Sequence, residues 1–380
     1  MPSVSKMIKG LKRSGIRELM ELSAEMDNVL HLEVGEPLFD TPTVITDDAF
    51  RQAKEGFTKY TPNRGFTSLR AACAERLNKD YGLQLNYENV IITVGAVSAL
   101  AITVRALINS GEEILIPDPG WPNYDMIINC ANGIPKLYRL EPEKGFLPSI
   151  ADLEQRITPR TKAIIINTPS NPLGTVYPPE VMKEIVDFAR GKDLFVISDE
   201  VYEKIIYNGE HTSALSYDSD DHVIAIFSFS KTYAMTGWRV GYITASQALC
   251  SEIGKLQEAY VSCACSVSQK AAEAALAADR GVVDEMVAAY RDNLNLAVSI
   301  LEHHGLEYFT PSGAFYMWIK VGCTDSSEFA RALLKDQRVA VAPGTTFGES
   351  GVEYVRISLA SPREAIEEGV SRLSKYVQKI

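Results

Sequence analysis

Short apolar runs rich in β-branched residues alternate with amphipathic stretches through the middle of the chain. Five such runs predict strands, at residues 90–94, 113–117, 163–167, 194–198 and 222–227. The stretches between them, each next to turn-forming residues, predict helices near 68–81, 96–110, 122–132 and 178–192. Strands that alternate with helices indicate an α/β fold whose mostly parallel sheet is covered on both faces.

The pattern changes after about residue 280. A long amphipathic stretch at 282–304 is followed by a strand-like run at 314–321, a helical segment at 326–335 and a second strand-like run at 354–359. The first 42 residues are too short to fold alone. We therefore predict a large α/β domain at 43–280 and a smaller α+β domain that combines 1–42 with 281–380.

The composition is that of a globular protein. Of 380 residues, 46% are hydrophobic and 23% are charged, so a large core can be buried. A net charge of −11 without a long basic run disfavours a nucleic-acid or anionic-membrane surface. The six cysteines form no Cys-x-x-Cys pair and no zinc-type spacing with histidine, so we expect no metal. Because no leader pattern and no apolar run of about 18 residues occurs, we expect a cytoplasmic protein.

A glycine lies where the predicted strand at 90–94 ends. The segment Thr93-Val94-Gly95-Ala96-Val97 would leave free backbone N–H groups facing an anion at the start of a helix. It is neither a G-x-G-x-x-G fingerprint nor a P-loop, which argues against a dinucleotide or ATP. Taken alone, it is better explained as a glycine needed for tight packing.

The segment 228–242 follows an apolar strand and concentrates hydroxyl groups, a lysine and an arginine. Lysine is normally a surface residue, but Lys231 leaves a buried strand beside Ser228 and Ser230. An amine in that setting can have its pKa lowered enough to act as a nucleophile. With its S-x-S-K-x-x-x-x-x-G-x-R pattern, the segment resembles the class I/II aminotransferase family of fold-type I pyridoxal-5′-phosphate (PLP) enzymes. The resemblance extends over nearly the whole chain.

The resemblance implies a large domain with a mostly parallel, seven-stranded sheet and a smaller α+β domain. It implies that Lys231 holds PLP as a Schiff base and that Arg239 grips the cofactor phosphate, assisted by Ser228 and Ser230. The same phosphate would be bound by the backbone N–H groups of Gly95, Ala96 and Val97. Neither Ala96 nor Val97 carries a hydroxyl or amide side chain, so these contacts would be made by the backbone only.

Two further segments resemble the family's motifs in the family's order. The segment 167–175 resembles the N-x-P-x-N-P-x-G loop, which implies that Asn171 bonds the ring oxygen of PLP and lies near the substrate carboxylate. The segment 198–202 resembles D-E-x-Y. Asp199 would keep the pyridine nitrogen protonated, and Tyr202 would donate to the ring oxygen. Without the resemblance, the segment 167–175 would be interpreted as a proline-rich turn. Asp199 would be interpreted as a helix cap at the end of a strand.

Four more residues complete the site that the resemblance implies. Trp121 would stack on the cofactor ring. Arg356 would clamp the substrate's α-carboxylate with help from the N–H of Gly35, although an isolated arginine in a strand is usually a structural ion pair. Tyr60 would reach the cofactor phosphate of a partner subunit, which implies a homodimer. Arg64 would either read an acidic side chain in the neighbouring site or form a surface salt bridge.

The resemblance implies an aminotransferase that moves an amino group from an L-amino acid to a 2-oxo acid by ping-pong chemistry. The same apparatus also supports elimination, replacement or cyclisation, so a PLP-dependent lyase or synthase acting on a modified amino acid is the alternative. The unusual Ala96-Val97, Arg64 and Leu38, which stands where relatives commonly have an aspartate, give that alternative some weight. A transcription regulator is disfavoured, because the motif at Gly35 begins too early for a helix-turn-helix before it. Acidic, aromatic and small apolar amino acids all stay open as substrates.

Overall fold

The computed structural model describes residues 3–11 and 15–379. A seven-stranded sheet has the order β2-β8-β7-β6-β5-β3-β4. Its strands are β2 (Val90–Thr93), β3 (Glu113–Asp118), β4 (Ile134–Arg139), β5 (Thr161–Asn167), β6 (Phe195–Asp199), β7 (Val223–Ser228) and β8 (Gly241–Thr244). Only β8 runs antiparallel to its neighbours β2 and β7. The predicted seven-stranded, mostly parallel sheet is thus confirmed.

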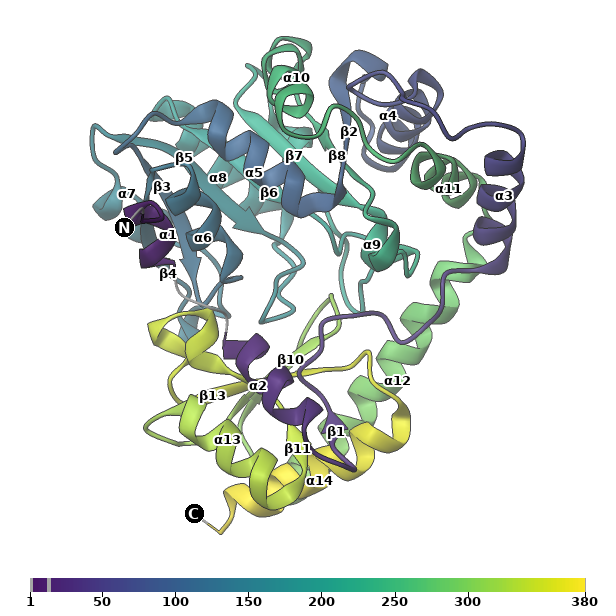
Figure 1. Ribbon diagram of the computed structural model, residues 1–380. Coiled ribbons are helices and arrows are strands. Elements are labelled where there is room, and N and C mark those ends of the chain that lie inside the picture. The colour runs from purple at the N-terminus through teal and green to yellow at the C-terminus, as the bar shows by residue number, and fades with distance from the viewer. Residues whose placement is uncertain (1–2, 12–14, 380) are drawn as a thin grey trace.

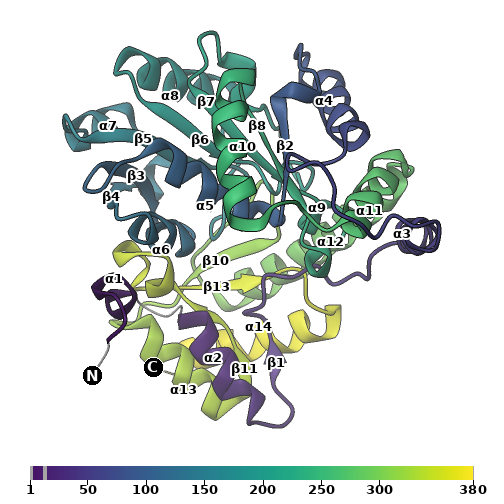
Figure 2. The same ribbon diagram turned by 45° about the horizontal axis from the view of Figure 1, so that its top comes forward.

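Helices cover both faces of this sheet (Figures 1 and 2). They are α3 (Thr43–Lys54), α4 (Thr67–Tyr81), α5 (Gly95–Leu107), α6 (Asn123–Cys130), α7 (Ile150–Arg156), α8 (Pro179–Gly191), α9 (Phe229–Thr232), α10 (Gln247–Val261) and α11 (Ser266–Ala277). In β5, Ala163 and Ile165 pack with α5, α6 and α10, whereas Ile164 and Ile166 pack with α4, α8 and α11. Because alternate side chains point to opposite faces, a strand buried on both faces is apolar throughout.

Several strands and helices were not predicted from the apolar pattern, and their exposure, length or composition explains why. β4 is an edge strand, mostly half-exposed, with a proline and two basic residues among its six. β8 has only four residues, and it begins at a glycine directly after two loop residues. The helices α3, α10 and α11 were also not predicted, because their apolar faces are narrow or interrupted.

A smaller unit follows the long helix α12 (Gly281–His304). Its sheet has the order β12-β13-β10-β9, formed by β9 (Tyr308–Phe309), β10 (Tyr316–Lys320), β12 (Ala342–Pro343) and β13 (Tyr354–Ser358). The helices α13 (Ser326–Gln337) and α14 (Arg363–Val377) pack on it. The segments predicted at 282–304, 314–321, 326–335 and 354–359 therefore have the expected type.

The beginning of the chain packs on this C-terminal unit. The strand β1 (Leu30–His31) pairs in parallel with β11 (Val339–Ala340), and helix α2 (Gly15–Ala24) lies beside α13. The short helix α1 (Lys6–Gly10) lies near α6. These contacts agree with the division into 43–280 and 1–42 plus 281–380, which stays a prediction; residues 1–2, 12–14 and 380 lie outside the described ones.

The carboxyl ends of the parallel strands face the smaller unit. In Figure 1 the large sheet lies above β10 and β13, and the loops that follow its strands point toward them. Ligands of open α/β sheets bind at this edge, in crevices outside the carboxyl ends of the strands. No helix within residues 3–11 and 15–379 combines the length and apolarity needed to span a bilayer.

Candidate active site

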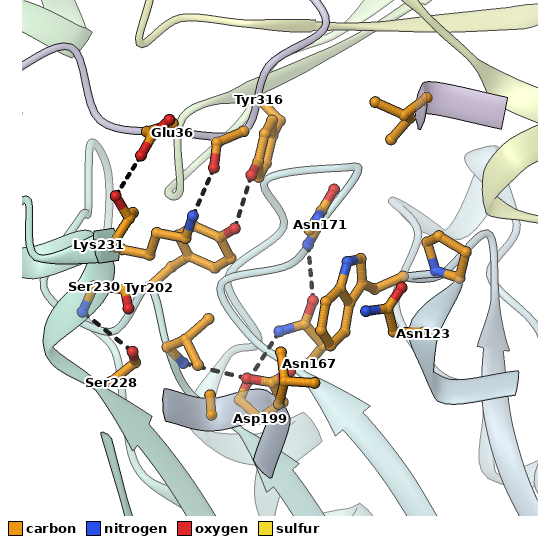
Figure 3. A pocket seen from close by; sticks show the side chains of 18 of the residues that line it. Glu36, Asn123, Asn167, Asn171, Asp199, Tyr202, Ser228, Ser230, Lys231 and Tyr316 are labelled. Atoms are coloured by element: carbon orange, nitrogen blue, oxygen red, sulfur yellow. Dashed lines mark hydrogen bonds between the residues drawn. The ribbon is translucent and has the colours of Figure 1, made fainter. Parts of the chain in front are cut away.

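A cavity of about 640 Å³ lies between the carboxyl edge of the large sheet and the smaller unit. Of the site residues predicted from the sequence, those that line it are Gly35, Ala96, Val97, Trp121, Asn171, Asp199, Tyr202, Ser228, Ser230, Lys231, Arg239 and Arg356. Only Gly95 and Tyr60 are outside this wall. These residues come from seven segments, far apart in sequence, that converge on one space. Figure 3 shows several of them together.

Lys231 lies in α9, a single helical turn directly after β7. Ser228 begins that turn, and its hydroxyl accepts a hydrogen bond from the N–H of Ser230 over 3.1 Å. The lysine Nζ donates to the carbonyl oxygen of Gly35 over 2.6 Å, which connects the large sheet to the N-terminal loop (Figure 3). Burial lowers the pKa of Lys231 to about 8. About a tenth of this amine is therefore neutral, and hence nucleophilic, at pH 7, far more than for an exposed lysine.

Asp199 is buried at the end of β6. Its Oδ2 accepts a hydrogen bond of 2.6 Å from the hydroxyl of Tyr124 in α6, and its backbone oxygen accepts one of 2.9 Å from Asn167 Nδ2. Burial raises the pKa of Asp199 to about 6, while the Tyr124 hydrogen bond opposes that rise. The side chain is a carboxylate at neutral pH, and its Oδ1 has only a long contact of 3.4 Å with the N–H of Val201.

Arg356 in β13 is the buried cation of the smaller unit, 2% exposed. Its Nη1 donates to Asn171 Oδ1 over 3.0 Å, its Nη2 donates to the carbonyl oxygen of Glu33, and the guanidinium lies over the ring of Tyr316. The Nε is buried without a hydrogen-bond partner in the described part of the chain. Burial lowers the pKa of Arg356. A buried guanidinium that lacks a carboxylate partner is suited to binding an anion.

A second polar contact connects the two parts of the molecule. The hydroxyl groups of Tyr202, after β6, and Tyr316, in β10, lie 2.8 Å apart (Figure 3). Neither Tyr124 nor Tyr316 was predicted as a site residue. Tyr124 lies in the helix predicted near 122–132, and Tyr316 lies in the strand-like run at 314–321. Nothing in the local spacing of either segment indicates that their hydroxyl groups reach Asp199 and Tyr202.

A group of hydrogen-bond donors at the start of α5 borders the same cavity as Lys231. Gly95 has a φ of +74°, and a β-carbon there would come within 2.6 Å of Arg239 Nη2. Val94, the N-cap residue of α5, makes no side-chain cap, so the first N–H groups of this helix are available to a ligand. Arg239 Nη1 donates to the carbonyl oxygen of Thr236 over 2.8 Å, which holds the guanidinium at the cavity wall. Backbone donors and a cation together form an anion site.

Tyr60 and Arg64 lie away from the cavity. Tyr60 is 92% exposed, on the loop after α3. Arg64 Nη1 donates to Glu88 Oε2 over 2.9 Å, and the arginine also bonds the carbonyl oxygen of Glu88. Of the two roles considered for Arg64, the structure shows the salt bridge.

In the described ranges, no group of three or more His, Cys, Asp or Glu side chains is placed to hold a metal ion.

The fold and the cavity together define an α/β protein whose site places a buried lysine amine beside a group of anion-binding donors. The model of the family "Aminotransferase class I and II" matches residues 27–373. The aspartate aminotransferase of Pyrococcus horikoshii is 37% identical, over 97% of this chain and 95% of that one. Aromatic-amino-acid aminotransferase 2 of Thermococcus litoralis is 36% identical, over 99% of each.

Solved structures agree with the sequence comparisons. The aspartate aminotransferase of Thermotoga maritima superposes with a TM-score of 0.94 at 33% identity, and the match covers 99% of this chain and 100% of that one. The chain belongs to the class I and II aminotransferase family. It is an enzyme of fold-type I that transfers amino groups, as the sequence predicted, and the lyase or synthase alternative is not favoured.

Proposed function

We propose that the cavity holds PLP and transfers the amino group of an L-amino acid to a 2-oxo acid. The observation that carries this proposal is the convergence of Lys231, Asp199 and Arg356 on one cavity: a nucleophilic amine, a buried carboxylate and a buried cation with an unpaired Nε. When bound, PLP supplies an aldehyde that captures amines and a protonated ring that accepts electrons from the substrate's α-carbon.

The residues present fit this cofactor. The first N–H groups of α5, the guanidinium of Arg239 and the hydroxyls of Ser228 and Ser230 would hold the phosphate. Because Gly95 lacks a side chain, the arginine can approach the helix end closely. Asp199 would bind the pyridine N–H, since a carboxylate stabilises a positive charge there. The remaining ring contacts are assigned to Trp121, Asn171 and Tyr202.

Substrate would be oriented by Arg356 and the loop at Gly35. The guanidinium would bind the α-carboxylate, supported by the N–H of Gly35 and the amide of Asn171. That contact would direct the α-hydrogen toward Lys231 Nζ. The neutral amine would remove the proton from the α-carbon and later return one, which is general base and acid catalysis by a single group. The burial that lowers the pKa of Lys231 increases the fraction of the amine that is in its neutral, basic form.

A homodimer with Tyr60 at the partner's phosphate is part of the proposal. Large apolar side chains are also exposed in the segment that precedes Tyr60 in the sequence, at Val44, Phe50 and Phe57. A monomer gains nothing from such exposure, whereas an interface would bury it. We also propose a cytoplasmic location, because all six cysteines are free, as is usual in a reducing compartment.

The test uses the purified protein, the Lys231→Ala variant and a panel of amino acids and 2-oxo acids. We expect the wild-type protein to bind PLP with visible absorbance and to convert each consumed amino acid into an equal amount of 2-oxo acid. The variant should lose this conversion while it retains the fold by circular dichroism. Release of ammonia in place of a new amino acid would establish a lyase instead, and failure to take up PLP would overturn the proposal.

A further inference from the structure

One buried tyrosine of the smaller unit contacts residues on both sides of the proposed site. Tyr316 begins β10 and lies at the cavity wall, 1% exposed. Its hydroxyl lies 2.8 Å from that of Tyr202, which the proposed function assigns to the cofactor. The guanidinium of Arg356, assigned to the substrate, lies 4.2 Å from the centre of the Tyr316 ring. The proposed function leaves Tyr316 itself without a role.

The pairing of β10 with β13 explains the contact between the ring and the guanidinium. The strands are antiparallel, with Tyr316 opposite Ser358 and Trp318 opposite Arg356. Directly opposite residues share a face of the sheet, and so do alternate residues of one strand. Tyr316 and Arg356 are therefore diagonal neighbours on one face. The strand register alone places the ring next to the guanidinium.

The Tyr316 hydroxyl is held between the N-terminal loop and Tyr202. A β-carbon at Gly35 would lie 2.5 Å from this oxygen, closer than van der Waals contact permits. On the other side, the rings of Tyr202 and Tyr316 pack edge to face, with their centroids 5.6 Å apart. Figure 3 shows the two hydroxyl groups pointing toward one another. Packing thus fixes the oxygen of Tyr316 within reach of the Tyr202 hydroxyl.

The hydrogen bond between these two hydroxyls has a preferred direction. In the described part of the chain, Tyr202 is the one hydrogen-bond partner of the Tyr316 hydroxyl. Burial raises the pKa of both tyrosines, although Arg356 opposes the rise at Tyr316, so both are protonated at neutral pH. A buried proton needs an acceptor. If Tyr316 donates to Tyr202, its proton is satisfied and the Tyr202 proton is free to point into the cavity.

We propose that Tyr316 is a positioning residue whose hydroxyl directs the Tyr202 proton to the ring oxygen of PLP and whose ring supports Arg356 in the geometry that binds the α-carboxylate. This inference rests on the proposed function and adds a residue to it. Hydrogen bonds in a chain polarise one another, so Tyr202 becomes a stronger donor when Tyr316 donates to it. The face of the Tyr316 ring attracts the cation above it.

The pH dependence of the visible absorbance of the PLP-bound enzyme tests the hydroxyl. A donor to the ring oxygen draws negative charge away, so the nitrogen that joins PLP to Lys231 holds its proton less tightly. We expect Tyr316→Phe to raise the pH midpoint of the absorbance change by about half a pH unit. In a Tyr202→Phe background the same substitution should have no further effect, because Tyr316 acts through Tyr202.

A second substitution tests the ring. Tyr316→Phe keeps the aromatic face next to Arg356, whereas Tyr316→Leu removes it. We expect the KM for amino acids to be about fivefold higher in Tyr316→Leu than in Tyr316→Phe. Circular dichroism checks that both variants fold. Tyr138→Phe is the matched control for both measurements, since its buried hydroxyl donates to the carbonyl oxygen of Ile165 and lies outside the cavity wall.

Three results would overturn the inference. An unchanged midpoint in Tyr316→Phe, or an equal rise when Tyr202 is already replaced, would show that the hydroxyl does not act through Tyr202. A KM in Tyr316→Leu no higher than in Tyr316→Phe would show that the ring does not support Arg356. Equal changes in Tyr138→Phe would indicate a general effect of removing a buried hydroxyl. The proposed function fails by a separate observation, a wild-type protein that gains no visible absorbance with PLP.

Discussion

The hydroxyl of Tyr124 lies 2.6 Å from Asp199 Oδ2 and joins helix α6 to the end of β6 at the cavity wall. Both groups are buried, and the pKa of Tyr124 is raised well above its usual value by burial. The tyrosine is therefore the donor in this hydrogen bond. It holds one carboxylate oxygen and leaves the other available to the cofactor.

Replacement of Tyr124 by Phe should weaken the cofactor site without unfolding the protein. The buried carboxylate loses its donor at a cost of about 1–3 kcal/mol, and the pKa of Asp199 should rise further because this hydrogen bond opposes the effect of burial. We expect weaker PLP binding and a lower kcat. Tyr138→Phe is the control, because it removes one buried hydrogen bond of similar length, to the carbonyl oxygen of Ile165. Equal losses in both variants would contradict a specific role for Tyr124.

Covalent capture of PLP by the apoprotein should accelerate as the pH rises through about 8. The pKa of Lys231 is lowered to about 8 by burial, and only the neutral amine has the lone pair that attacks an aldehyde. Below that pH the rate should fall about tenfold per pH unit, and above it the rate should level off. Stopped-flow absorbance gives this profile. Pyridoxamine phosphate needs no lysine attack, so its binding rate is the control; a flat PLP profile between pH 6 and 9 would refute the assignment.

Arg356→Lys should raise the KM for amino acids far more than it lowers kcat. The charge is retained, but the paired donors to Asn171 and to the substrate carboxylate are lost. We expect a loss of about 2–3 kcal/mol in kcat/KM. Arg372→Lys, in an exposed ion pair with Glu368, serves as the matched surface variant and should behave as wild type. A change confined to kcat would show that Arg356 acts in some way other than substrate binding.

Mixing two defective variants tests whether Tyr60 serves the partner's site. We expect Tyr60→Phe to bind PLP weakly and Lys231→Ala to be inactive. If each site combines Lys231 of one subunit with Tyr60 of the other, a mixed dimer contains one intact site and one doubly defective site. Refolding the variants together should restore up to half the activity per mixed dimer. No recovery, despite mixed dimers seen by native mass spectrometry, would place Tyr60 in its own subunit's site or outside both.

Much of the site could be predicted because its residues are carried by short segments that follow strands. Lys231, Asp199 and Asn171 each lie at or just after the end of an apolar strand of the parallel sheet. The carboxyl ends of parallel strands meet at one edge, so such segments converge whatever the loops between them do. The small edge strand β4 and the four-residue β8 were missed, because exposure and shortness remove the apolar pattern that identifies a strand.

The sequence by itself determined the class of fold, the family, and the lysine, carboxylate and arginine of the site, since these depend on local motifs and their order. Only the tertiary structure decided which side chains support them. Tyr124 reaches Asp199 across 75 positions, and Tyr316 meets Tyr202 across 114. Such contacts depend on how α6 and β10 pack and on which face each turns inward. The pattern of residues within each of these elements does not determine that packing, because the packing depends on the other elements against which each one is buried.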